Sequence, residues 1–321
     1  GVLVAFLALV ARFFQPIQQL TRFYNQLQST MAAGEKIFEL LDEPEEISDR
    51  PNATVLPRID GHVEFDRVTF SYGTNDVLRD VSFSVEPGQR VALVGPTGAG
   101  KTTTINLLAR FYDASKGEIR IDNHAITSVT QQSLRNQLGI VPQDSYLFSG
   151  SIYSNIAFSR PDATRAAVVE AAQAVGADHF INELPHGYAT DVRERGSRLS
   201  VGQRQLICFA RALLADPRIL ILDEATSSVD ARTEQTIQNA LTHLLQGRTS
   251  FVIAHRLATI RQADLILVFE NGQIAERGSH DALLDSRGLY YKLYTTGFPG
   301  TDAVETGPSQ TSAPPRRMWG G

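Results

Sequence analysis

The sequence predicts an α/β domain whose core is a parallel sheet, with a layer of antiparallel strands beside it. Stretches with helical periodicity separate three short, uncharged apolar runs, at 91–94, 219–222 and 251–254, which is typical of parallel strands buried on both faces. Residues 63–65 and 81–85 instead alternate apolar and polar side chains, as half-buried antiparallel strands do. With 42% apolar and 20% charged residues, the chain of 321 residues can bury a sizeable core and does not resemble a disordered protein.

Composition also narrows the possible partners. The formal net charge of −5 gives no support to a nucleic-acid partner. The single cysteine, Cys208, cannot form an internal disulfide, which favours a reducing compartment, and we expect it to be an ordinary buried side chain. Without a second cysteine or a histidine pair at ligand spacing, a structural zinc site is not expected.

The first predicted element is a helix over residues 1–41. Its first residues form an uncharged apolar run that ends at Arg12, shorter than the roughly 20 residues that cross a bilayer. A buried core helix would explain the run, but the chain begins with Gly rather than Met, and we expect the cut end of a membrane helix in a fragment of a longer protein. From Ile17 onwards, apolar side chains recur at alternating steps of three and four. A coiled coil would give this stripe, although we favour packing against other helices of the same protein.

The remaining elements follow from the pattern of prolines and apolar residues. Prolines and a run of acidic residues predict a linker over residues 42–57 and a folded domain over residues 58–297. Residues 265–269 form a further strand, and Asn271-Gly272 predicts a hairpin turn after it. Because the chain then becomes rich in Gly, Pro, Ser and Thr, we expect residues 298–321 to be disordered.

A phosphate-binding pattern follows the first of the buried strands. Residues 95–102 read Gly-Pro-Thr-Gly-Ala-Gly-Lys-Thr and match G-x-x-x-x-G-K-[ST], with a helical stretch at 103–111 behind them. The glycines allow backbone N–H groups to point at phosphate oxygens, and the helix N-terminus favours the anion. We expect Lys101 to reach the β- and γ-phosphates and the Thr102 hydroxyl to bind Mg²⁺. The predicted nucleotide-binding residues here are Gly95, Pro96, Thr97, Gly98, Ala99, Gly100, Lys101, Thr102 and Thr103.

Two carboxylates, Asp223 and Glu224, end the second buried strand. Asp223 is expected to hold Mg²⁺, and Glu224 to polarise the water that attacks the γ-phosphate, as a general base. Side chains of adjacent strand residues point to opposite sides, so the pair is not expected to share a proton. Two solvated acids would be the purely structural alternative. Together with the phosphate loop, the pair predicts a P-loop NTPase core.

The segment Leu199-Ser200-Val201-Gly202-Gln203 resembles the L-S-G-G-Q signature of ATP-binding-cassette (ABC) ATPases, and it lies just upstream of the acidic strand, as in that family. The resemblance implies a helical subdomain that carries the signature and a head-to-tail dimer. In such a dimer, Ser200, Gly202 and Gln203 would face the γ-phosphate held by the opposite domain. Ser200 and Gln203 also have capping-box spacing for a helix at 204–214. Val201 replaces the first glycine of the pair, which we expect to tune activity rather than abolish it.

Four further positions match the family's motifs. Tyr72, in Phe-Ser-Tyr-Gly, resembles the aromatic residue that stacks on adenine, and Gln143 resembles the Q-loop glutamine that touches Mg²⁺. Asp230 ends a segment that resembles the D-loop, and His255 resembles the switch histidine that contacts the γ-phosphate. The resemblance therefore implies that Glu224, His255 and Gln143 are catalytic, that Thr102, Gln143 and Asp223 bind the metal, and that Tyr72 and Asp230 bind the nucleotide.

The segment Thr190-Asp-Val-Arg-Glu-Arg-Gly196 resembles the T-x-V-G-E-R-G loop of exporters, with Arg193 in place of the first glycine. In that family the loop contacts intracellular ends of transmembrane helices. The helix over residues 1–41 is similar to the last transmembrane helix of a fused exporter. The resemblance extends over residues 1 to about 297 and identifies the C-terminal part of an exporter-type half-transporter of the multidrug or lipid kind.

This resemblance implies Mg²⁺-dependent ATP hydrolysis that powers export of a small molecule or lipid across the cell membrane, with the nucleotide-binding domain on the cytoplasmic side. The expected partner is a second half-transporter, identical or different, and no nucleic acid. Two alternatives stay open at this point. A soluble cassette ATPase would need no apolar helix at its N-terminus, and an importer's separate ATPase subunit would begin near Val63.

Overall fold

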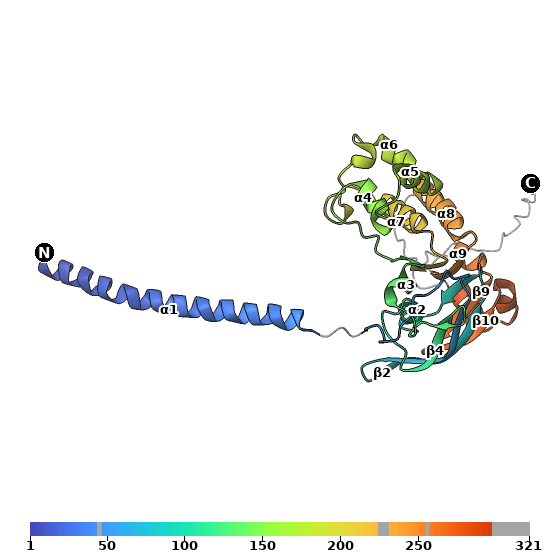
Figure 1. Cartoon of the computed structure of the whole chain (residues 1–321), viewed down its shortest axis with the longest axis horizontal. Coiled ribbons are helices and arrows are strands. Elements are labelled where there is room, and N and C mark those ends of the chain that lie inside the picture. The colour runs from blue at the N-terminus through green and yellow to red at the C-terminus, as the bar shows by residue number, and fades with distance from the viewer. Residues whose placement is uncertain (44–46, 224–230, 255–256, 297–321) are drawn as a thin grey trace, which may run out of the picture. The chain divides into compact units, whose positions relative to one another are not determined.

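The computed structural model describes residues 1–43, 47–223, 231–254 and 257–296. The chain divides into two compact units, Gly1–Ser48 and Asp49–Gly321 (Figure 1). The tail for which the composition predicts disorder lies outside the described residues.

The first unit is dominated by one long helix, α1 (Val2–Leu41), which contains Pro16 and ends one residue before Asp42. None of its residues is buried. By length and composition alone, α1 is apolar enough to cross a membrane. The prediction of a helix that continues to residue 41 is confirmed.

The second unit is built on a six-stranded sheet with the order β10-β9-β3-β8-β7-β6. All neighbours in it are parallel except the β9–β10 hairpin. Asn271 and Gly272 make the hairpin turn with positive φ angles, as predicted. The strands are β3 (Arg90–Val94), β6 (Leu138–Val141), β7 (Ile219–Asp223), β8 (Thr249–Ile253), β9 (Leu265–Glu270) and β10 (Gln273–Gly278).

A four-stranded antiparallel sheet, in the order β2-β1-β4-β5, forms the second layer. Its strands are β1 (Val63–Tyr72), β2 (Asn75–Val85), β4 (Lys116–Ile121) and β5 (His124–Ala125). The alternation at β1 and β2 buries one face, on which Phe65 and Phe83 stack with their ring centroids 4.4 Å apart. This face and one side of the parallel sheet share one apolar cluster, to which β3 contributes Val91 and Leu93.

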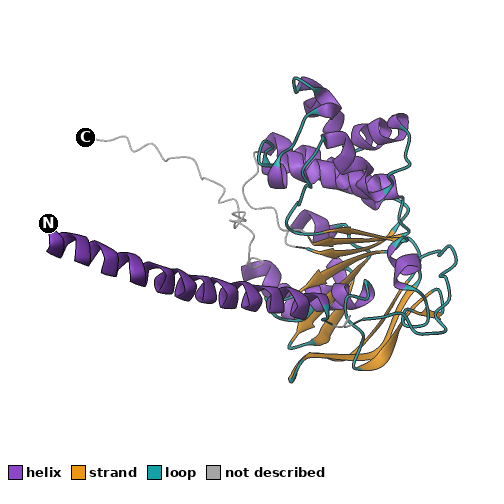
Figure 2. Cartoon of the chain, turned by 60° about the vertical axis from the view of Figure 1, so that its left-hand side comes forward, coloured by secondary structure: helices purple, strands orange, loops and turns teal. Residues whose placement is uncertain are grey.

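The other side of the parallel sheet belongs to a second apolar cluster, to which β3 contributes Ala92 and Val94. Helices α4 to α8 contribute half of its buried residues, and they gather on one side of the domain (Figure 1), above the strands in Figure 2. Cys208 is buried within α7, as expected. The helices of the second unit are α2 (Lys101–Leu108), α3 (Gln131–Arg135), α4 (Ile152–Ile156), α5 (Arg165–Ala174), α6 (Ala177–Glu183), α7 (Val201–Ala215), α8 (Ala231–Leu245), α9 (Leu257–Arg261), α10 (His280–Asp285) and α11 (Leu289–Thr296). The predicted fold class is thereby confirmed.

Part of the segment expected to be a linker packs against this unit. Thr54 forms a bridge with Val129, and the backbone N–H of Leu56 donates to Ser133 Oγ at 2.9 Å. The Leu56 side chain is buried. The compact unit therefore begins at Asp49, upstream of the start that the sequence suggests at residue 58.

Candidate functional site

The phosphate-loop pattern forms the connection between β3 and α2. Gly95, Gly98 and Gly100 adopt φ angles of +147°, +82° and +105°, a region that side chains other than glycine rarely occupy. A Cβ atom at Gly95 would also collide with the carbonyl oxygen of Phe269 in β9. Glycine is thus required here both for backbone conformation and for close contact with a neighbouring strand.

Lys101 is the first residue of α2, and only 9% of it is exposed. Its ammonium group donates hydrogen bonds to the carbonyl oxygens of Gly95 (2.8 Å) and Pro96 (2.9 Å). Burial lowers the pKa of Lys101, and the negative charge of Asp223 acts in the opposite direction. The loop therefore holds a buried cation against its own carbonyl oxygens at the start of a helix, whose N-terminus favours anions such as phosphates.

Three threonines follow Lys101, and their surroundings differ. Thr102 is exposed, whereas Thr103 and Thr104 are buried. The Thr104 hydroxyl donates to the carbonyl oxygen of Gly100 at 3.0 Å and so ties the helix to the loop. Only Thr102 of the three presents its side chain to solvent, where a hydroxyl could bind a metal ion.

The carboxyl ends of β7 and β6 bring two further predicted residues to one edge of the sheet, where open α/β sheets bind their ligands. Asp223 is the last residue of β7, and Gln143 follows β6 with its side chain exposed. Glu224, Asp230 and His255 lie outside the described residues.

Hydroxyl, amide and carboxylate oxygens are the ligand types that Mg²⁺ prefers, and Thr102, Gln143 and Asp223 supply one of each. Within the described residues there is no group of three or more His, Cys, Asp or Glu side chains that could hold a metal ion by themselves. The donor set thus fits Mg²⁺ that also binds phosphate oxygens, as in nucleotide sites.

Tyr72 is the last residue of β1, and 40% of it is exposed. Its ring contacts Phe70 and Tyr112 edge to face, with centroids 4.8 and 5.1 Å away. No pattern in the sequence predicts a role for Tyr112. Its position shortly after the helix of the phosphate loop suggests that it lies near the site, but only the structure shows that it contacts Tyr72.

The signature segment begins α7 with Ser200 as the N-cap. Ser200 Oγ accepts from the backbone N–H of Gln203 (3.2 Å), and Gln203 Oε1 accepts from that of Ser200 (3.0 Å). The predicted capping box is confirmed, although the helix begins at Val201 rather than at residue 204. Gly202 is buried, whereas 45% of Val201 is exposed. The substituted position therefore presents an apolar side chain at the helix N-terminus.

In the loop before the signature segment, Arg193 stands at a position where the exporter pattern has glycine, and its backbone conformation is one that suits glycine. Arg193 has φ +59° and ψ −171°. Its backbone N–H donates to Asp191 Oδ1 at 2.9 Å, and its side chain is exposed. This region of backbone conformation is almost exclusive to glycine, so the arginine is held in a strained conformation.

Comparisons with known proteins agree with this geometry. The sequence model of the ABC transporter family matches residues 78–227. The chain is 54% identical over 295 residues to the fatty acid ABC transporter ATP-binding/permease protein of Mycobacterium tuberculosis, a match that covers 91% of this chain and 46% of that protein. It is 44% identical over 298 residues to the ATP-dependent lipid A-core flippase of Syntrophus aciditrophicus, over 93% of this chain and 50% of that protein.

Among solved structures, the chain matches a bacterial Atm1-family ABC exporter with ATP bound, with a TM-score of 0.78 and 44% identity, over 92% of this chain and 51% of that one. The chain thus spans about half the length of the relatives that it matches. One of these relatives is named a flippase and the matched structure is an exporter, which argues against the importer subunit. The chain therefore contains an ATP-binding domain of the ABC transporter family, of the exporter type.

Proposed function

We propose that this chain hydrolyses ATP to power export of a substrate across a membrane. The observation that carries the proposal is the phosphate loop itself, in which the buried ammonium group of Lys101 lies among backbone groups at the start of α2. Asp223, which influences the pKa of Lys101, ends the strand on the same edge of the sheet. A loop of this kind binds the phosphates of a nucleotide.

Each predicted residue has a distinct part in the proposed reaction. Gly95 to Thr103 bind the phosphates, and the exposed ring of Tyr72 stacks on the adenine. Thr102, Gln143 and Asp223 would hold Mg²⁺, which would supply positive charge to the phosphate oxygens. Glu224 accepts a proton from the water that attacks the γ-phosphorus, while the bond to the β-phosphate oxygen breaks. His255 contacts the γ-phosphate. Residues proposed to complete the site from the opposite domain are Ser200, Gly202, Gln203 and Asp230.

The transport role rests on the relatives and on α1. A fatty acid transporter and a lipid A-core flippase are among the relatives, which supports a small molecule or lipid as the exported substrate. The apolar length of α1 supports a place in a membrane. On the resemblance to exporters, the proposed site is the cell membrane, with the ATP-binding domain on its cytoplasmic side. A soluble cassette ATPase would not need this helix. The proposed partner is a second half-transporter, either a copy of this chain or a different one, that supplies the opposite signature segment.

Replacement of Glu224 by Gln tests the mechanism. The change keeps the side-chain shape but removes the proposed base, so we expect ATP hydrolysis to fall by about two orders of magnitude or more. ATP affinity should stay close to wild type because Lys101, Asp223 and Tyr72 are unchanged, and the variant should accumulate as an ATP-bound dimer on size exclusion. Lys101→Ala should instead lose binding and dimer together. Near-normal turnover of Glu224→Gln would place the base elsewhere, with His255 as the next candidate.

A further inference from the structure

Three aromatic rings form a cluster at the end of β1. Tyr72 contacts Phe70 at 4.8 Å and Tyr112 at 5.1 Å between ring centroids, with interplanar angles of 89° and 90°. Phe70 and Tyr112 also contact each other, at 5.5 Å. Phe70 is buried, Tyr112 is partly buried and Tyr72 is exposed. Two perpendicular neighbours thus restrain the plane of Tyr72, the most exposed ring of the three.

We propose that Tyr112 is a positioning residue for recognition of the nucleotide base, because it holds the Tyr72 ring in the orientation that stacks on adenine. This rests on the proposed function of Tyr72. Stacking requires the base to meet the face of the ring, so an aromatic side chain that fixes the ring plane reduces the ordering cost of binding. Tyr112 acts through Tyr72 and need not touch the nucleotide.

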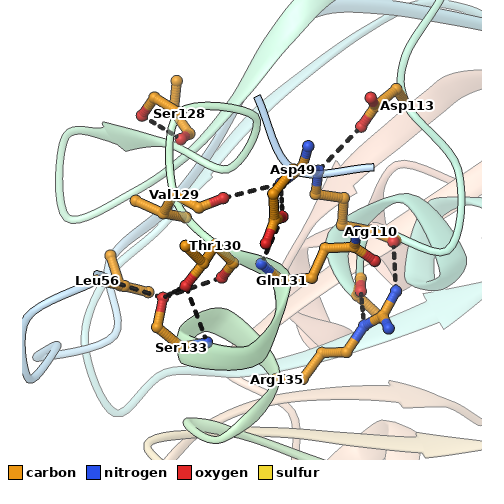
Figure 3. A network of polar contacts seen from close by, with 12 residues as sticks. Asp49, Leu56, Arg110, Asp113, Ser128, Val129, Thr130, Gln131, Ser133 and Arg135 are labelled. Carbon is orange, nitrogen blue, oxygen red and sulfur yellow. Dashed lines mark hydrogen bonds and ion pairs between the residues drawn. The ribbon is translucent and has the colours of Figure 1, made fainter. Parts of the chain in front are cut away.

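Arg110, two residues before Tyr112, contacts the side chain of Asp113, the residue after it (Figure 3). Arg110 is completely buried and has a left-handed φ of +51°. Its Nε donates to Asp113 Oδ1 at 3.1 Å, and its Nη1 donates to the carbonyl oxygen of Val129 at 2.8 Å. Its own carbonyl oxygen accepts from Arg135 Nη2 at 2.9 Å. The residues just before and just after the Phe111-Tyr112 pair are therefore tied to each other and to α3.

The same arginine connects this network to the N-terminal end of the unit. Asp49 Oδ1 accepts from Arg110 Nη1 at 3.5 Å and from the backbone N–H of Gln131 at 2.9 Å (Figure 3). A buried guanidinium group depends on its carboxylate partners, so loss of Asp49 disturbs the segment that carries Tyr112. Through Tyr112, the proposal therefore couples the Asp49–Arg110 ion pair to binding of the base, and this coupling is reciprocal.

Comparison of two ligands separates this role from simple packing. The probes are a non-hydrolysable ATP analogue, adenylyl imidodiphosphate, and inorganic tripolyphosphate, each with Mg²⁺ and the whole chain in detergent. For Tyr112→Leu we expect the dissociation constant of the analogue to rise about three- to tenfold, the range that loss of an aromatic pair gives. The affinity for tripolyphosphate, which has no base, should not change. Tyr112→Phe should bind the analogue like wild type, and Tyr291→Leu in α11 is the matched control.

A double-mutant cycle tests whether Tyr112 acts through Tyr72. In a protein that already carries Tyr72→Leu, adding Tyr112→Leu should not raise the dissociation constant of the analogue any further. In the otherwise wild-type protein, Asp49→Asn should raise the dissociation constant of the analogue about two- to threefold. The affinity for tripolyphosphate should again stay unchanged. This variant keeps the aromatic rings and serves as the second test if Tyr112→Leu does not fold.

The possible results distinguish failure of the positioning role of Tyr112 from failure of the proposed stacking of Tyr72 on the base. Additive effects of the two leucine variants would overturn the positioning role, as would equal losses for the analogue and tripolyphosphate. Wild-type affinity of Asp49→Asn for the analogue would overturn the connection to Asp49. If Tyr72→Leu itself left the analogue affinity unchanged, the proposed stacking of Tyr72 would be wrong, and the role of Tyr112 with it.

Discussion

The ammonium group of Lys101 is buried among carbonyl oxygens, and burial lowers its pKa. Bound phosphates would favour the charged form and raise that pKa again. We therefore expect ATP binding to take up protons, and to weaken with rising pH, in alkaline buffers below the ordinary lysine pKa of about 10.4. Calorimetric titrations at one pH in buffers of different ionisation enthalpy measure this uptake. Absence of proton uptake throughout this range would show that Lys101 stays fully charged without nucleotide.

Site residues that belong to one continuous segment of the chain can be predicted from the sequence, whereas those that depend on distant partners cannot. The phosphate loop is one unbroken segment, and its three glycines have the positive φ angles that the pattern implies. The capping box at Ser200 and Gln203 is likewise local. Tyr112 could not be predicted because its role depends on a ring far away in the sequence. The sequence places Asp49 in a linker for the same reason, since its partner Arg110 belongs to a distant segment.

At the scale of elements, the strands with the strongest apolar pattern are those the sequence predicts. Runs such as Ile219–Leu222 are buried on both faces and contain no charged residue. No sequence pattern predicts β4 (Lys116–Ile121), in which charged residues occupy half of the positions. The same holds for β6 (Leu138–Val141), which is only four residues long and lies at the sheet edge. Pairing with β1 and β7 stabilises these two strands, and such contacts leave no periodic signal.

The short helical turn Glu194–Gly196 follows a strained residue, Arg193. Glycine can adopt the same φ and ψ without the steric cost of a side chain, although it loses more entropy on folding. Arg193→Gly should therefore increase the free energy of unfolding by about 1 kcal/mol net. Thermal unfolding of the two proteins measures the difference, and Arg198→Gly, without a positive φ, should give no gain. A lower midpoint for Arg193→Gly would show that contacts of the arginine outweigh the strain.

At the scale of the whole molecule, the residues just before position 58 contribute to the stability of the ATP-binding unit. Residues 49–57 provide the buried side chain of Leu56, the bridge at Thr54 and the carboxylate of Asp49 beside Arg110. A domain that begins at residue 58 lacks all three and leaves a fully buried guanidinium with one carboxylate fewer. Burial of a leucine side chain alone stabilises by about 1.5–3 kcal/mol.

We therefore expect a protein of residues 49–296 to be more stable than one of residues 58–296, by about 3 kcal/mol in the free energy of unfolding. Urea denaturation of both proteins in the same buffer measures the difference as a shift of the midpoint. Asp49→Asn in the longer protein separates the contribution of the ion pair from that of Leu56, because it leaves the apolar contact in place. Equal midpoints would mean that residues 49–57 contact the domain without stabilising it. In that case the ATP-binding unit would begin at residue 58, as the sequence alone suggests.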